Sequence, residues 1–398
     1  MNLFYNNTSP ENDLLEFEQI TKILLNDNHN HFISDWDSDG SLVYLKELYN
    51  KAYNLSIEHI DKYNSSEMNE CQDVICNYIN RIYGISLSHN QVIIGNSASS
   101  MISFYLTFLL SKNIKNFLCF TPLYYSFIDT LEIQNTNIIL YQMNLSYPFF
   151  DIKEVENIIQ NYNIQCVILT NPIFCFGIDL DMQIINTLSK LLNKYNCVLV
   201  MDCTREGLHW NVENEKTIIG HSITICNEVK NYVLIYSPCK NVFANGIKTG
   251  MMILPYKEAM NIFPIQDTFI GSISSIQIKF LLELFLEINA EYISTRITEN
   301  KKYIISNFQK LSSMLLNTPI KLIAPNSGVY SVAKIMKGQM NDKDLFYKIL
   351  KNNNTITLPM SLYNYFDTDY YLFRINLSLN AKKLIYFVEE LTELKKEF

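Results

Sequence analysis

The sequence predicts an α/β protein in which helices cover both faces of a mostly parallel sheet and a smaller α+β domain follows. From about residue 91, short apolar runs alternate with stretches whose apolar residues recur at helical spacing. The short runs are apolar throughout, which is typical of strands buried on both faces of a parallel sheet. Beyond about residue 275 the strand signals become weaker and lie between two long helical patterns. This change predicts the second domain.

The strands of the large sheet are expected in sequence order across the middle of the chain. They are predicted at residues 91–94, 116–120, 138–141, 166–169, 198–201 and 232–236, with a weaker one at 222–226 and another apolar run at 251–254. Between them, Ile102, Tyr105 and Leu109 fall on one face of a helix. A further helix begins after Asp181, whose carboxylate we expect to cap it.

The two ends of the chain have different patterns. Helices are expected at residues 14–24, 42–49, 74–82 and from 275, followed by strands at 320–323, 329–332 and 371–375 and a final amphipathic helix. We therefore expect an N-terminal segment (1–50) that joins the small domain, a large domain (51–270) and a small C-terminal domain (271–398).

Composition disfavours several classes of protein. The chain has 398 residues and is 48% apolar, enough for two cores, but no apolar run approaches the length of a membrane helix. A net charge of −8 disfavours nucleic-acid binding. Nine cysteines without close pairs predict reduced thiols, and the N-terminus lacks a secretion signal, so a cytoplasmic location is expected. His29 and His31 are close in sequence, but a polar loop is favoured over a metal site.

Polar or aromatic side chains stand at the carboxyl ends of five predicted strands: Ser97, Tyr124, Asn171, Asp202 and Lys240. In parallel sheets these ends form the usual functional site. Lys240 follows an apolar strand and a Ser-Pro turn, and a lysine held beside apolar residues can act as an amine nucleophile. An ordinary surface lysine is the alternative reading of that stretch alone.

The order and spacing of these positions resemble the class I/II aminotransferases, the fold-type I pyridoxal-phosphate enzymes, over roughly residues 30–390. The resemblance implies a three-layer large domain of the aspartate aminotransferase type, with pyridoxal 5′-phosphate as cofactor. The run Ser237-Pro238-Cys239-Lys240 resembles the family's Ser-x-x-Lys, so Lys240 would form the imine with the cofactor and move the substrate proton. Asp202 would pair with the pyridine nitrogen and keep the ring protonated.

The same resemblance implies roles around the cofactor ring. Asn171 would donate to the cofactor's phenolic oxygen and contribute to the substrate site, and Tyr124 would stack on the ring, with core packing as its alternative. Arg205 stands where the family usually has a tyrosine that donates to the phenolic oxygen. Arg205 could donate with a full charge, or it could pair with Glu206 and point away.

The phosphate and the substrate carboxylate are also assigned by resemblance. The implied phosphate ligands are Ser97, Ala98 and Ser99 at a helix start, Ser237, Lys248 in place of the usual arginine, and Tyr63 from the partner of a homodimer. Arg374, in Phe373-Arg374-Ile375-Asn376, would clamp the α-carboxylate of the substrate with two parallel hydrogen bonds. A structural salt bridge is the alternative for Arg374.

The implied function is transfer of an α-amino group from an amino acid to a 2-oxo acid in a homodimeric enzyme. A lyase, decarboxylase, racemase or oxidase with the same cofactor stays open, because Arg205 and the segment after Asn171 depart from the family pattern. A binding protein that inherited the fold is disfavoured, since folding does not require Lys240, Asp202, Asn171 and Arg374 together.

Overall fold

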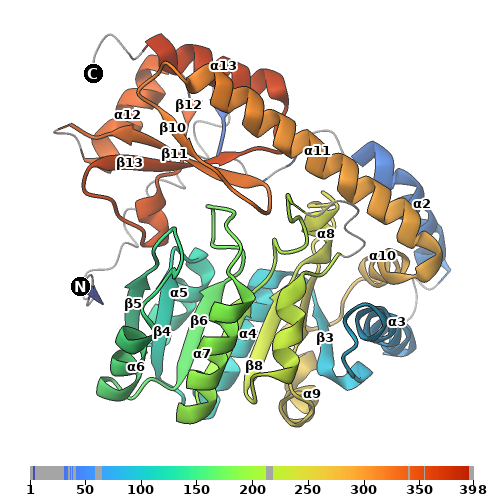
Figure 1. Cartoon of the computed structure of the whole chain (residues 1–398). Helices are drawn as coiled ribbons and strands as arrows, with labels where there is room; N and C mark the ends of the chain where they lie inside the picture. Colours follow the sequence, from blue (N-terminus) through green and yellow to red (C-terminus); the bar gives the residue numbers. More distant parts are fainter. Residues whose placement is uncertain are drawn as a thin grey trace.

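The computed structural model describes residues 3–4, 31–34, 36, 38, 42–58, 65–211, 218–338, 341–353 and 355–393. Its main feature is an eight-stranded sheet in the order β1-β5-β4-β6-β7-β8-β9-β3 (Figure 1). The strands are β1 (Leu3–Phe4), β3 (Val92–Gly95), β4 (Asn116–Thr121), β5 (Asn137–Gln142), β6 (Cys166–Thr170), β7 (Val198–Asp202), β8 (Tyr232–Tyr236) and β9 (Gly250–Ile253). Strands β5, β4, β6, β7 and β8 run parallel, whereas β9 is antiparallel to its neighbours.

Helices cover both faces of this sheet, as predicted from the continuous apolar strands. Every residue of β6 and β8 is buried. Successive residues of β3 point to opposite sides: Ile93 packs with α4 (Ala98–Ser111), α5 (Tyr125–Ile133) and α9 (Tyr256–Ile270), and Ile94 lies in the core under α3 (Ser65–Tyr83), α6 (Ile152–Asn161) and α7 (Met182–Tyr195). The predicted three-layer α/β class is therefore confirmed.

Local signals explain where individual elements begin, and one prediction fails. The Asp181 carboxylate accepts the Gln183 N–H at 2.7 Å and caps α7, as expected. Residues 222–226 do not form a strand; they belong to a 3-10 helix, η2 (His221–Asn227). β7 and β8 are hydrogen-bonded directly to each other, so the sheet has no place for a strand between them. The alternating Ile223 and Ile225 are buried in η2 instead.

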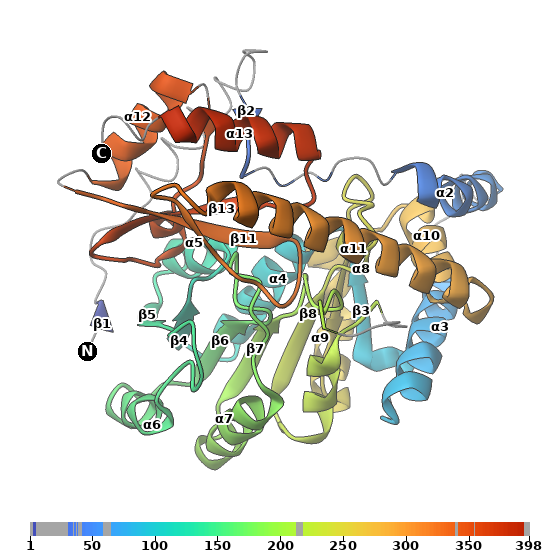
Figure 2. The same ribbon diagram turned by 45° about the horizontal axis from the view of Figure 1, so that its top comes forward.

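A three-stranded antiparallel sheet lies above the carboxyl ends of the large sheet (Figure 1). It consists of β10 (Lys321–Ile323), β11 (Tyr330–Met336) and β13 (Tyr370–Asn376). Helices α11 (Ala290–Leu315), α12 (Asp342–Asn353) and α13 (Ala381–Glu393) accompany it, with α11 and α13 on its outer side (Figure 2). β2 (His31–Phe32) pairs with β12 (Thr355–Ile356), which attaches the chain around residue 33 to this part of the molecule.

Three helices connect the two parts. α10 (Ser275–Phe285) packs against α2 (Leu42–Ile57) and α3, and ion pairs join Lys279 to Glu67 and Lys51 to Glu283. The domain boundaries expected at residues 50 and 270 stay predictions, and the helix expected at 14–24 lies outside the described residues. All nine cysteines are free. In the part of the chain that the structure describes, no helix is both long and apolar enough to cross a membrane.

Candidate active site

A cavity of about 490 Å³ lies where the carboxyl ends of the parallel strands face the small sheet. Its walls include most of the residues predicted from the sequence: Ser97, Ala98, Ser99, Tyr124, Arg205, Ser237, Lys240 and Lys248. Trp36, Tyr125, Cys239, Asn245, Ile247 and Thr249 complete the lining. Asp202, Asn171 and Arg374 lie behind these walls, each almost completely buried. Tyr63 falls outside the described residues.

Lys240 sits in a short helix, α8 (Pro238–Asn241), immediately after β8. Burial lowers the pKa of its amine to about 8, and the nearby Arg205 acts in the same direction while Asp202 opposes it. About a fifth of the amine is therefore neutral near pH 7.4, whereas an ordinary lysine is almost fully protonated there. A neutral amine is the form that attacks carbonyl carbon and accepts protons.

Asp202 ends β7 one strand away and is 2% exposed. Burial raises the pKa of its carboxyl, whereas Lys240, the Thr204 N–H at 2.9 Å and Arg205 hold that pKa down. Burial outweighs these neighbours, so the pKa of the Asp202 carboxyl lies above its usual value, and Lys240, Thr204 and Arg205 limit the rise.

Arg205 turns toward the cavity. Its Nη2 donates to the Tyr330 hydroxyl at 3.1 Å, and its guanidinium carbon lies 5.2 Å from the centre of that ring. Glu206 has other partners: its Oε1 accepts the Asn171 Nδ2 at 3.2 Å and the Ser222 N–H at 2.9 Å. The alternative in which Arg205 pairs with Glu206 is not what the structure contains.

Asn171 is directed into the protein. Its Nδ2 donates to the Ser222 hydroxyl at 2.9 Å as well as to Glu206, and its Oδ1 accepts the Leu180 N–H at 2.9 Å. Every polar atom of its side chain therefore has a protein partner. The role of Asn171 toward a cofactor and substrate stays a prediction, and it requires one of these bonds to be exchanged.

The start of α4 offers a seat for an anion. The Ser97 hydroxyl accepts the Ser100 N–H at 3.0 Å, which leaves the N–H groups of Ala98 and Ser99 at the helix start without a partner in the helix. Close packing shapes this seat: a Cβ on Gly250 would lie 2.3 Å from the Ser97 carbonyl oxygen. Lys248 lies exposed at the edge of the cavity.

Ser237 and Tyr124 already have partners in the protein. The Ser237 hydroxyl donates to the Thr249 carbonyl at 2.8 Å, and the Tyr124 hydroxyl lies 3.2 Å from that of Ser99. Both residues nevertheless line the cavity beside Lys240.

Arg374 on β13 is fully buried, and no carboxylate pairs with it among the described residues. Its Nη1 donates to the Tyr363 hydroxyl at 3.3 Å, its Nη2 donates to the Ser34 carbonyl, and its Nε has no partner. The guanidinium carbon lies 3.6 Å from the centre of a Trp36 ring. The structural salt bridge considered as its alternative is not found in the described part of the chain. A buried cation whose Nε–H lacks a partner suits an anionic ligand.

Sequence reasoning missed the aromatic residues around Arg374. Trp36, Tyr330 and Tyr363 all lie against its guanidinium. No local signal marks them, because the contacts join segments that are far apart in the chain. Trp36 stands in the acidic stretch 35–39, which is typical of a solvated surface loop, so it was not predicted as a site residue.

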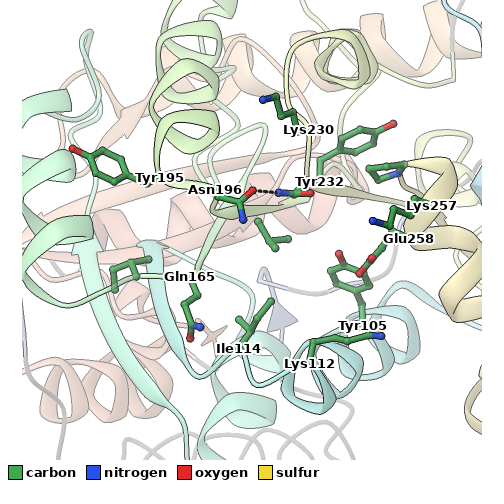
Figure 3. A pocket seen from close by; sticks show the side chains of 14 residues that line it. Tyr105, Lys112, Ile114, Gln165, Tyr195, Asn196, Lys230, Tyr232, Lys257 and Glu258 are labelled. Carbon is green, nitrogen blue, oxygen red and sulfur yellow. Dashed lines mark hydrogen bonds between the residues drawn. The ribbon is translucent and has the colours of Figure 1, made fainter.

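A second cavity, of about 520 Å³, lies at the opposite edge of the large sheet (Figure 3). It is bordered by residues that precede β4, β6, β7 and β8, and by Lys112, Lys257 and Glu258. The Asn231 Nδ2 donates to the Asn196 Oδ1 across it at 3.0 Å. None of the predicted site residues borders this cavity, so volume does not identify the site here.

Comparisons with known proteins bear on the family and the fold. A family model described as aminotransferase class I and II matches residues 33–391. Among solved structures, the Thermus thermophilus aspartate aminotransferase with maleate has a TM-score of 0.78 at 14% identity, covering 96% of each chain. Escherichia coli YbdL, described with a methionine aminotransferase function, has a TM-score of 0.79 at 14% identity, covering 95% of this chain and 97% of its own.

The Mycobacterium tuberculosis N-succinyldiaminopimelate aminotransferase has a TM-score of 0.80 at 11% identity, covering 98% of this chain and 100% of its own. At these identities the structural likenesses show the fold alone. No curated protein matches the chain by sequence.

Proposed function

Because the chain belongs to the class I and II aminotransferase family, we propose that it moves an α-amino group from an amino acid to a 2-oxo acid with pyridoxal 5′-phosphate. One observation carries the proposal. Lys240 lines the cavity, and the buried, carboxylate-free Arg374 lies behind the cavity wall, stacked on the lining residue Trp36 and close enough for its charge to lower the pKa of Lys240. A nucleophilic amine beside an anion-binding guanidinium suits an α-amino acid.

The residues present fit the cofactor. The free N–H groups at the start of α4, Ser237 and Lys248 would hold its phosphate. Lys240 would bond its aldehyde carbon, Asp202 would pair with its ring nitrogen and Tyr124 would cover its ring face. When bound, pyridoxal phosphate supplies a ring that withdraws electrons from the substrate's Cα.

The chain's own groups then position the substrate and move its proton. Arg374, whose Nε–H has no partner, would bind the α-carboxylate, which would fix the Cα–H bond relative to Lys240. The Lys240 amine, with its pKa lowered to about 8 by burial, would accept that proton and return it. The carboxylate of Asp202, stabilised by cationic neighbours, would keep a proton on the ring nitrogen. We include in the proposal a homodimer in which Tyr63 reaches the partner's phosphate, and a cytoplasmic location.

A second candidate keeps the cofactor and changes the reaction to decarboxylation, racemisation, elimination or oxidation. It is favoured by the arrangement of Asn171 and Arg205: the neutral amide is engaged by Glu206 and Ser222, while a cation faces the cavity. A full charge beside the cofactor would change which bond at Cα breaks most readily.

The test begins with cofactor attachment. Purified protein mixed with pyridoxal phosphate and reduced with borohydride should carry the cofactor's mass on the peptide that contains Lys240, and Lys240→Ala should carry none. Protein that takes up no cofactor would overturn both candidates.

The loaded protein is next given an amino acid without an oxo acid, then denatured, and its cofactor is separated by chromatography. Conversion to pyridoxamine phosphate supports transamination. Release of carbon dioxide, or a racemised amino acid without pyridoxamine phosphate, supports the second candidate instead.

A further inference from the structure

Trp36 lies between the buried Arg374 and the open cavity. Its ring centre is 3.6 Å from the guanidinium carbon of Arg374, which is a stacking distance. The same side chain lines the cavity wall next to Tyr124, with the two ring centres 5.9 Å apart and nearly perpendicular. One residue therefore contacts the predicted carboxylate clamp and also faces the space in which a substrate would lie.

The backbone around Trp36 is fixed from two sides. On the side of the small sheet, the Ile33 N–H donates to the Ile356 carbonyl at 3.3 Å, and the Ser34 hydroxyl accepts the Leu358 N–H at 2.9 Å. On the side of Lys240, the Asn245 Nδ2 donates to the Trp36 carbonyl at 3.4 Å and to the Ser38 hydroxyl at 3.0 Å. These bonds hold the indole in place over the cavity.

Aromatic rings continue from Trp36 around the site. We call Trp36, Tyr124, Phe174, Tyr330 and Tyr363 the aromatic wall. The centre of the Trp36 ring lies 6.4 Å from that of Phe174 and 6.3 Å from that of Tyr330, and the Phe174 and Tyr363 rings are 5.0 Å apart. Three of its rings, Trp36, Tyr330 and Tyr363, lie against the guanidinium of Arg374, and the wall reaches the cavity at Trp36 and Tyr124.

The cations near the aromatic wall already have other partners or proposed roles. The unpartnered Nε–H of Arg374 would serve the α-carboxylate, and Arg205 donates to the Tyr330 hydroxyl while acting on Asp202. Lys248 is an exposed residue of the cavity lining, two positions before Gly250, which packs on the start of α4. Besides Lys240, the cations among the described residues that line the cavity are Arg205 and Lys248, and a second carboxylate on a substrate would have to draw one of them from the place given above.

We propose that the amino-acid substrate carries an aromatic side chain that lies against the aromatic wall, and that Trp36 is the residue that determines this specificity. The inference rests on the proposed function. A substrate ring placed here gains apolar burial and edge-to-face contacts with the wall. A side-chain carboxylate at the same place would lose water and would gain a cationic partner only by drawing Arg205 away from the Tyr330 hydroxyl.

The experiment measures binding of ligands that have no amino group and therefore cannot react. Cofactor-loaded protein is titrated by calorimetry with 3-phenylpropanoate, propanoate and succinate. The wild type should bind 3-phenylpropanoate at least tenfold more tightly than either other ligand, a difference of about 1.4 kcal/mol. In Trp36→Ala the preference over propanoate should fall below threefold, and Trp36→Phe should retain most of it.

Three results would overturn the inference: tightest binding of succinate, equal binding of all three ligands by the wild type, or an equal loss of 3-phenylpropanoate and propanoate binding in Trp36→Ala. The last result would mean that Trp36 only supports Arg374. The order of the three affinities is measured on the wild type, so the inference can be overturned even if Trp36→Ala folds poorly.

The test is independent of the reaction. A chain that binds the aromatic acid but makes no pyridoxamine phosphate would contradict transamination and leave the specificity intact. A chain that transaminates aspartate best and binds succinate best would contradict the aromatic specificity and leave transamination intact.

Discussion

The charge on Lys240 depends on the groups immediately around it. Burial and Arg205 lower the pKa of its amine to about 8, and the carboxylate of Asp202 raises it again. The neutral amine is the reactive form, so the side chain becomes competent as the pH rises through its pKa.

The rate of cofactor attachment should report this balance. For the wild type we expect a rate that rises with pH and levels off above about pH 8, instead of near the value of about 10.4 for an ordinary lysine. Asp202→Asn removes the group that raises the pKa, so its curve should level off at lower pH. Borohydride trapping followed by mass spectrometry measures both rates, with pyridoxal phosphate reacting with free Nα-acetyl-lysine as the reference. An unchanged curve in the variant would mean that Asp202 does not act on the charge of Lys240.

Glu206 should make stability depend on pH. Burial raises the pKa of its carboxyl from 4.5 to about 7, and its Oε2 has no hydrogen-bond partner in the described structure. The folded state therefore binds the proton more tightly than the unfolded state. The resulting stabilisation is complete below about pH 4.5 and is lost as the pH rises through 7. The wild type should thus lose about 3 kcal/mol of unfolding free energy across this range through this group.

The comparison for Glu206 is with Glu206→Gln, which keeps an oxygen for Asn171 and Ser222 but cannot ionise. Urea denaturation of both proteins from pH 4.5 to 8 gives the two stability curves. The curves should diverge as the pH rises, with the variant losing less stability. Parallel curves would contradict the assigned ionisation.

For single residues, the sequence predicts which side chains border the cavity better than it predicts which partners they contact. Lys240, Tyr124 and Ser97 were predicted as site residues from their place after strands, and they do border the cavity. The inward direction of Asn171 depends on Glu206 and Ser222, which lie 35 and 51 positions away, so no local pattern contains it. The place of Trp36 depends on segments more distant still.

Strand ends and the helix that starts beside them determine the shape of the anion seat. β9 passes so close to the start of α4 that Gly250 has no room for a side chain, whereas a Cβ on Gly246, in the preceding loop, would have nothing within 4 Å. The two glycines are thus a matched pair in one segment.

Gly250→Ala should displace β9 from the start of α4, because the atom that a Cβ would meet is backbone oxygen at 2.3 Å. We expect at least a tenfold loss of pyridoxal-phosphate affinity and a loss of about 1–3 kcal/mol of stability from overpacking. Gly246→Ala should change both quantities little. Fluorescence titration and thermal unfolding test the pair. Equal effects in the two variants would show that close packing at Gly250 does not shape the seat.

Elements were predicted well where the chain is apolar throughout and poorly where it alternates over a few residues. β6, β7 and β8 begin and end within one residue of expectation, because strands buried on both faces leave an unbroken apolar run. Residues 222–226 carry two isoleucines two positions apart, a spacing that a short 3-10 helix can bury as well as a strand. The direct pairing of β7 with β8 leaves no place for a strand at residues 222–226. Such pairing joins distant segments and cannot be predicted from a short stretch of sequence.

For the whole molecule, the site depends on two sheets being held together. Lys240 comes from the large sheet and Arg374 from the small one, and Asn245 bonds the loop after Lys240 to the backbone around Trp36. The fold class, a large mostly parallel sheet followed by a smaller domain, was predictable from the order of the strands and helices. Their exact contact was not, since it rests on side chains from distant segments.

Asn245→Ala should loosen this connection. Loss of its two hydrogen bonds should cost about 1 kcal/mol of stability and increase amide exchange in residues 31–38, with β6–β8 unchanged. The control is Asn231→Ala, which removes a comparable bond to Asn196 at the opposite edge of the sheet and should leave residues 31–38 unaffected. Hydrogen–deuterium exchange with mass spectrometry resolves both. Unchanged exchange in Asn245→Ala would mean that other contacts hold the segment.

The position of Trp36 also means that its intrinsic fluorescence can report on the cavity. The chain has two tryptophans, and the other, Trp210, packs on Phe308 with its indole N–H bonded to the Gly328 carbonyl at 3.1 Å. Trp210→Phe would leave one emitting indole, stacked on a guanidinium at the wall of the cavity. Its emission wavelength and intensity would then follow the filling of the site directly, without an attached dye and without turnover.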